Sequence, residues 1–192
     1  MRYLARLICL LILSSAQAFA SETQQVELVV FRQGSERLQA SHIAPDNWAN
    51  GATPITSEML RSTHLNHLVD KLEAAEGYQV LLHKAWLQNS QDGVMQVAIT
   101  AGQKHFGHYP VEGTLDFTLD RTSAVQLDLW VNQFNPDHTL HSSERFKQKT
   151  MVTNDQVTFI DYGTLGALIR IQAQHSQSQP SQSNNLNPED FE

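Results

Sequence analysis

The chain has 192 residues, and its 13 lysines and arginines against 20 aspartates and glutamates give a formal net charge of −7. This excess of negative charge argues against nucleic acid and anionic lipid as partners. A single cysteine, Cys9, excludes an internal disulfide and a cysteine metal site.

Residues 1–20 have the order of a secretory signal peptide. Arg2 and Arg6 give a positive start, Leu7–Ser14 is apolar, and Ala18-Phe19-Ala20 has the small-x-small form of a cleavage site. The apolar run is too short to span a bilayer, and no other segment is long enough. We therefore expect an exported protein that has no membrane span after cleavage.

The rest of the chain is predicted to hold one domain and a tail. From Gln174 onward the sequence is polar and offers almost nothing to bury, which predicts a disordered polar tail over residues 174–192. Residues 21–173 are long enough for a single α+β domain with its own core. We find no internal repeat and no second domain.

The domain is predicted to begin with a strand and a long loop. Gln25–Arg32 is rich in residues that favour β-structure. The stretch Gln33–Thr56 loses periodicity and collects glycine, proline and asparagine, and loops of this length are uncommon unless they are functional or mobile. Trp48 in its middle is expected to plug the loop against the domain.

One helix is predicted next. Five apolar side chains fall on one stripe at helical spacing, and Gly77 is a natural C-terminal residue: Leu65, Leu68, Val69, Leu72 and Ala75. Ser57 or Ser62 is expected to cap its N-terminus. As the only clear helix, it is the natural cover for the apolar face of the sheet.

The remaining elements are predicted to be strands. Tyr78–Gln88 has apolar residues on both faces, which indicates a central strand. A turn over Asn89–Gly93 leads to a partner strand at Val94–Ile99. The chain closes with a long polar strand at Ser143–Val152 and two short ones at Val157–Ile160 and Ala167–Ile171.

The clearest pattern lies in Val111–Val131. Apolar and polar residues alternate there in two runs separated by a short break, which predicts an antiparallel hairpin with one apolar and one wet face. Pairing Leu119 with Val125 would set Asp116 opposite Asp128, an unfavourable like-charge pair. Pairing Leu119 with Leu127 avoids this and is preferred, unless the two aspartates share a cation. The predicted fold is α+β, a mostly antiparallel β-sheet with one main helix packed on its apolar face.

Motifs for catalysis are absent from the sequence. It has no Gly-x-Ser-x-Gly, Ser-x-x-Lys or His-Glu-x-x-His motif, and no phosphate-binding glycine loop. Paired carboxylates could still act on a glycan, but no spacing identifies such a pair. We predict a protein that is not an enzyme and needs no cofactor. The three His-x-x-His pairs are interpreted as surface histidines and not as metal ligands: His64/His67, His105/His108 and His138/His141.

Four segments in this order resemble the CsiV family: QVELVVF, GYQVLLHKAWLQ, GTLDFTLDR with LDLW, and FIDYGTLGALIRI. The resemblance covers residues 25 to 171. It implies a periplasmic peptidoglycan-binding protein of Gram-negative bacteria that supports cell-wall synthesis and cell shape. The implied protein partner is a penicillin-binding-protein synthase or its lipoprotein activator.

Several positions match the family's own motifs. His83 and Trp86 match its His-x-x-Trp, Arg121 matches its hairpin arginine, and Asp128-Leu129-Trp130 matches its Asp-Leu-Trp. Phe159–Gly163 departs from its Tyr-Ile-Asp-His-Pro. Two alternatives stay open, a murein-processing enzyme that uses paired carboxylates and a protein–protein adaptor without affinity for glycan.

The wet face of the hairpin is the candidate binding surface. Trp130 is out of pattern there, because Leu127 and Leu129 already serve the core. Sugar rings stack on indole, and their hydroxyls bind acceptors such as Asp128. In the other interpretation the loop with Trp48 covers Trp130. The candidate ligand-binding residues are Trp130, Asp128, Trp86, Thr114 and Asn132.

Overall fold

The computed structural model describes residues 23–34, 42–89, 94–119 and 121–173. The predicted signal peptide over residues 1–20 and the predicted tail over residues 174–192 lie outside the described residues. Most of the predicted turn at Asn89–Gly93 lies outside them as well.

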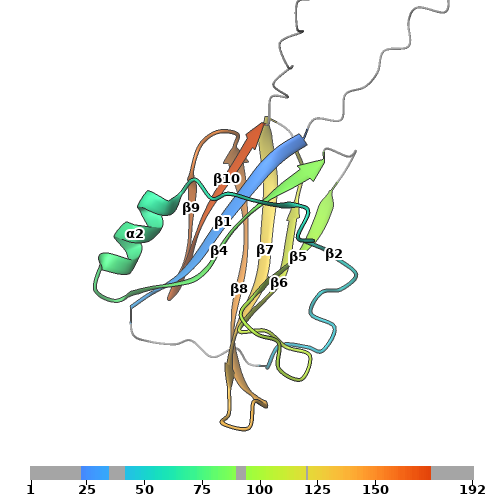
Figure 1. Cartoon of the computed structure of the whole chain (residues 1–192), viewed down its shortest axis with the longest axis vertical. Helices are drawn as coiled ribbons and strands as arrows, with labels where there is room; N and C mark the ends of the chain where they lie inside the picture. The colour runs from blue at the N-terminus through green and yellow to red at the C-terminus, as the bar shows by residue number, and fades with distance from the viewer. Residues whose placement is uncertain (1–22, 35–41, 90–93, 120, 174–192) are drawn as a thin grey trace, which may run out of the picture.

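The described chain forms two five-stranded sheets (Figure 1). The first sheet has the order β3 (Leu60–Arg61), β4 (Tyr78–Asn89), β1 (Thr23–Gln33), β10 (Leu165–Ala173) and β9 (Thr158–Tyr162). The second has the order β2 (Thr53–Pro54), β5 (Met95–Ala101), β6 (Val111–Phe117), β7 (Thr122–Phe134) and β8 (Leu140–Thr153). Neighbouring strands are antiparallel except for the short β2–β5 pair. With α2 (Asn66–Ala74) as the helix of the described residues, the predicted α+β class is confirmed.

Strand β1 is central in the first sheet and is buried on both faces. Val26, Leu28 and Val30 face the second sheet, whereas Val29 and Phe31 face away from it and pack with Leu65 at the start of α2. Two covered faces explain why apolar residues lie on both faces of this strand and do not alternate with exposed polar ones.

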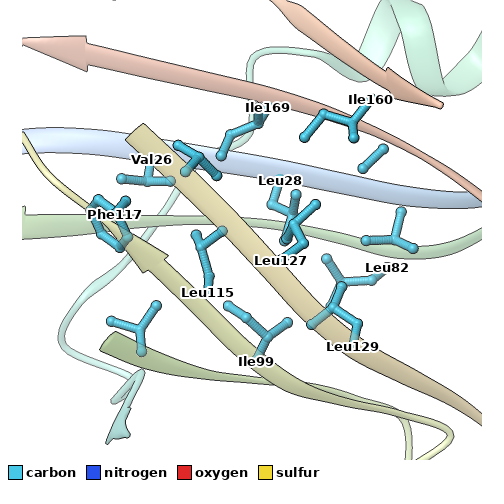
Figure 2. Packing of buried hydrophobic residues seen from close by; sticks show 14 of the residues in the cluster. Val26, Leu28, Leu82, Ile99, Leu115, Phe117, Leu127, Leu129, Ile160 and Ile169 are labelled. Atoms are coloured by element: carbon cyan, nitrogen blue, oxygen red, sulfur yellow. The ribbon is translucent and has the colours of Figure 1, made fainter. Parts of the chain in front are cut away.

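The apolar face of the β6–β7 hairpin is buried against the first sheet. Figure 2 shows Leu115, Leu127 and Leu129 from this hairpin with Val26 and Leu28 of β1 in one cluster. The expectation that the helix covers this face is wrong, because α2 packs on the far side of the first sheet. A helix of 9 residues is only about 14 Å long, whereas a strand of 13 residues spans about 43 Å, so a second sheet is the better cover.

The hairpin register differs from the predicted pairing of Leu119 with Leu127, and also from the rejected pairing of Leu119 with Val125. Leu115 lies opposite Leu127, Asp116 opposite Gln126, and Thr114 opposite Asp128. The observed register keeps the two aspartates from facing each other, which was the physical reason behind the prediction. It differs from the predicted pairings by an even number of residues, so the inward and outward faces were predicted correctly.

The N-terminus of α2 is capped from the neighbouring strand. Leu65 is the N-cap residue and makes no side-chain cap hydrogen bond. The backbone N–H groups of His64 and Leu65 donate instead to Oε1 of Glu27 in β1, at 2.8 and 2.9 Å. His83 Nε2 lies 2.8 Å from the same oxygen. A buried carboxylate on the sheet therefore takes the place of the predicted Ser57 or Ser62 cap.

Candidate functional site

A cavity of about 320 Å³ lies on the outer face of the second sheet. Its floor is formed by outward-pointing side chains of the strands β5 to β8: Gln96, Thr114, Asp116, Gln126, Asp128, Trp130, Arg145 and Lys147. Its wall is formed by the loop that precedes β2, through Pro45, Asn47, Trp48 and Asn50. The volume is at the lower end of the range for small-molecule sites.

The strand register explains why these side chains meet. Residues that lie opposite one another in adjacent strands point to the same face, so they form rows across the sheet. One row contains Gln96, Asp116 and Gln126. The next contains Thr114, Asp128 and Lys147, and the last pairs Trp130 with Arg145. The predicted wet face of the hairpin is thus extended by one strand on each side.

Asp128 is the centre of an ionic cluster. Nε and Nη2 of Arg145 donate to its two carboxylate oxygens, each at 2.8 Å, and Nζ of Lys147 lies 3.0 Å from Oδ2. The Arg145 guanidinium also lies over the Trp130 ring, 4.9 Å from its centroid. This bidentate contact fixes the positions of the Asp128 carboxylate and the Arg145 guanidinium. Because the guanidinium lies over the Trp130 ring, it also fixes the position of the indole.

The cluster keeps Asp128 ionised. Burial, the largest single influence, raises the pKa of Asp128, but the hydrogen bonds and charges of Arg145 and Lys147 together outweigh it. The pKa of Asp128 therefore lies below its ordinary value. The hydrogen bond with Asp128 in turn raises the pKa of Arg145.

This cluster predicts a pH-dependent stability difference between the wild type and Asp128→Asn. Because the folded-state pKa of Asp128 is lowered, the stabilisation is fully present above the ordinary value of about 4 and is lost as the pH falls through the folded pKa. Solvent screening of these partly exposed groups limits the stabilisation from the Asp128 ion pairs to about 1 kcal/mol, or ~2–4 °C in Tm. Melting curves should show a constant Tm difference above about pH 5 that shrinks below about pH 4. A difference that does not change with pH would contradict the cluster.

Asp116 has a different environment from Asp128. Its Oδ1 atom is buried and has no hydrogen-bond partner among the described residues. Gln96 and Gln126 are its cross-strand neighbours. The pocket thus holds two different carboxylates. Asp128 is neutralised by cations, whereas Asp116 has an oxygen that accepts no hydrogen bond from the described residues.

The loop wall is held by contacts with the loop between β5 and β6 and with strand β8. Trp48 Nε1 donates to Gly107 O at 3.3 Å, and its ring packs edge-on against Tyr109 with centroids 6.0 Å apart. The backbone N–H of Ala44 donates to Ser143 Oγ at 2.9 Å, and that hydroxyl donates to Asn132 Oδ1 at 2.7 Å.

Asn132 belongs to a buried polar network behind this wall. Its Nδ2 donates to Oε1 of Glu112 at 2.7 Å, and Nδ1 of His108 lies 2.6 Å from the same oxygen. Glu112 is 0% exposed and also accepts from the backbone N–H of Tyr109. His108 is 5% exposed, so its interpretation as a surface histidine is wrong. The buried carboxylate attracts the imidazole because it needs donors.

The structure brings three of the five candidate residues together. Trp130, Asp128 and Thr114 line the pocket. Asn132 is 7% exposed and positions the loop from behind without lining the pocket. Trp86 is 0% exposed in the core between the sheets, so the structure removes it from the ligand-binding surface. Its strand is apolar on both faces, and alternation therefore did not show which face it occupies.

Trp130 combines features of both interpretations, in which it either binds sugar or is covered by the loop that contains Trp48. It is 8% exposed, close to the expectation that other groups cover it. Arg145 lies over its ring, and Trp48 is in the loop wall of the same pocket. Five other floor residues were not predicted as site residues: Gln96, Asp116, Gln126, Arg145 and Lys147. These residues alternate with inward-pointing residues along their strands, and this alternation was the available signal. It assigns them to one site only when the order of the strands in the sheet is known.

The described residues show neither a metal-binding cluster nor a membrane-spanning helix. They contain no group of three or more histidine, cysteine, aspartate or glutamate residues that is arranged to hold a metal ion. No helix in this described part is long and apolar enough to cross a membrane.

A family model described as "Peptidoglycan-binding protein, CsiV" matches residues 56–173, which is more than half of the chain. The match runs from the segment before β3 to the end of β10 and includes every floor residue of the pocket. The loop wall precedes the matched range. No curated protein and no solved structure matches the chain.

Proposed function

The chain belongs to the CsiV family of peptidoglycan-binding proteins, and we propose that it binds peptidoglycan in the pocket between the Pro45–Asn50 loop and strands β5 to β8. The pocket is concave and combines two tryptophans with amide, hydroxyl and carboxylate groups: Trp48, Trp130, Gln96, Gln126, Thr114 and Asp116. A sugar polymer has rings with apolar faces and polar rims, so the Trp48 ring can contact a sugar face while the surrounding polar side chains bind its hydroxyl groups.

The proposed role is binding without catalysis, in the periplasm. The signal-peptide pattern of residues 1–20 supports export. Asp128 is held as a carboxylate by Arg145 and Lys147, so it is unsuited to be the general acid of a glycosidase, which needs a raised pKa. We further propose that the protein supports wall synthesis and cell shape together with a penicillin-binding-protein synthase or its lipoprotein activator.

Trp48→Ala should weaken binding to purified peptidoglycan sacculi by about tenfold or more, because a tryptophan that walls a binding site carries a large share of the affinity. The measurement is co-sedimentation of the purified protein with sacculi over a range of sacculus concentrations. Trp48 is half-buried, and the loop has other anchors at Ala44, so the variant should remain folded.

Phe159→Ala is the matched control for this experiment. Phe159 is 53% exposed and lies in β9 of the first sheet, away from the pocket. It removes an aromatic side chain without touching the pocket and should bind like the wild type. Wild-type affinity in Trp48→Ala would contradict the proposed site. Lack of sacculus binding by the wild type would favour a pure adaptor, and release of soluble fragments from the sacculi would favour an enzyme.

A further inference from the structure

The two carboxylates of the pocket present different chemistry to a ligand. Both oxygens of Asp128 accept from Arg145, and Lys147 adds a second cation at 3.0 Å. Asp116 has no ion pair among the described residues, and its buried Oδ1 has no hydrogen-bond partner there. Asp116 is only partly buried and lines the pocket, so its carboxylate, which lacks a full set of protein donors, can accept a hydrogen bond from a ligand that supplies one.

The charge balance of the pocket indicates the kind of ligand. Arg145 and Lys147 are both directed at Asp128, and with Asp116 the two positive and two negative charges of the pocket sum to zero. The remaining negative group is Asp116. An anionic ligand would bring a like charge towards it, whereas a neutral ligand with O–H or N–H donors would satisfy it.

Peptidoglycan offers both kinds of chemistry. Its glycan chain carries hydroxyl and acetamide groups, which supply neutral O–H and N–H donors. Its peptide stems carry several free carboxylates. The amide side chains of Gln96 and Gln126, which flank Asp116 across the sheet, suit the first kind because each can both donate and accept.

We propose that the pocket binds the glycan chain of peptidoglycan and leaves the peptide stems outside. Asp116 accepts a hydrogen bond from a sugar hydroxyl or acetamide N–H and is the residue that sets this preference. The cavity of about 320 Å³ has room for a short piece of sugar chain and not for a branched peptide as well. This inference rests on the proposed function, since it names the part of the polymer that the same pocket takes.

The first test is competition for sacculus binding. Glycan strands freed of peptide by an amidase, with the lactyl carboxylates that this cleavage leaves converted to neutral amides, should displace the wild-type protein from sacculi, and free stem peptides at the same concentration should not. Displacement by the stem peptides and not by the glycan strands would overturn the inference, while the proposed peptidoglycan site would stand. The proposed site itself is tested separately, by the comparison of Trp48→Ala with the wild type in sacculus binding.

The second test uses Asp116→Asn, which keeps the shape of the side chain and removes its charge. Its affinity for peptide-free glycan strands should fall by about tenfold, the loss expected for a hydrogen bond to a charged group. Its Tm should match or exceed that of the wild type, because no protein donor among the described residues loses a partner. A purely structural Asp116 would instead lower Tm and leave affinity unchanged.

Asp70→Asn is the matched control. It makes the same charge change in α2, on the outer face of the other sheet, where Asp70 is exposed. The glycan affinity of this variant should equal that of the wild type. Equal affinities for all three proteins would overturn the role of Asp116, and an equal loss in both variants would show a general charge effect instead.

Discussion

Glu144→Ala should lower the free energy of unfolding by about 3–5 kcal/mol, because it leaves a buried guanidinium without its partner. Oε2 of Glu144 in β8 lies 2.5 Å from Nη1 of Arg32 in β1, and the two side chains are 4% and 8% exposed. The hydroxyl of Thr164 donates to the other oxygen of Glu144. The ion pair links the two sheets in the interior, where an unpaired charge cannot be solvated. Urea denaturation followed by tryptophan fluorescence measures the loss.

The double variant Arg32→Met/Glu144→Leu is the control for this prediction. Replacing both charges with apolar side chains removes the desolvation cost together with the attraction, so most of the lost stability should return. Arg32 Nε also has no hydrogen-bond partner among the described residues, which adds to that cost. A loss below about 1 kcal/mol in Glu144→Ala would show that water reaches the pair.

Gly113→Val should prevent folding or cost more than about 4 kcal/mol, an effect at the extreme of single substitutions. Gly113 in β6 has a φ of +147°, which side chains rarely adopt. A Cβ atom there would lie 2.2 Å from Asp128 O and 2.7 Å from Leu129 Cα. These are backbone atoms of β7, so the clash can be relieved only by moving the strand that carries Asp128 and Trp130.

Gly34→Ala separates this clash from backbone strain alone. Gly34 also has a positive φ, +83°, but a Cβ atom there would meet nothing within 4 Å. It should therefore lose only about 1–2 kcal/mol. Circular dichroism and thermal melting of both variants test the comparison. A Gly113→Val protein as stable as Gly34→Ala would contradict the close approach of β6 and β7.

The sequence predicted local structure better than the arrangement of the sheets. Alternation in Val111–Val131 gave the hairpin and the direction of each side chain, and the stripe from Leu65 to Leu72 gave the helix. Neither pattern identifies the partner of an apolar face, so the second sheet was missed. Like-charge repulsion excluded one register correctly, but it did not distinguish the remaining registers that share the same faces.

The candidate site was predictable where it lies within one hairpin. Thr114, Asp128 and Trp130 share the wet face of Val111–Val131, and this could be read from the sequence. Gln96 and Arg145 join them from β5 and β8, which requires the strand order. The closed ion cluster and the unpartnered Asp116 oxygen depend on side-chain distances, for which the sequence has no signal.

The most direct test of peptidoglycan binding in the pocket uses the indole N–H signals of the three tryptophans in nuclear magnetic resonance spectra. Trp48 and Trp130 line the pocket, whereas Trp86 is 0% exposed in the core and is an internal control. On titration with soluble peptidoglycan fragments, the signals of Trp48 and Trp130 should shift with the same saturation curve, and that of Trp86 should stay in place. Saturable binding that leaves both pocket signals unchanged would contradict the account.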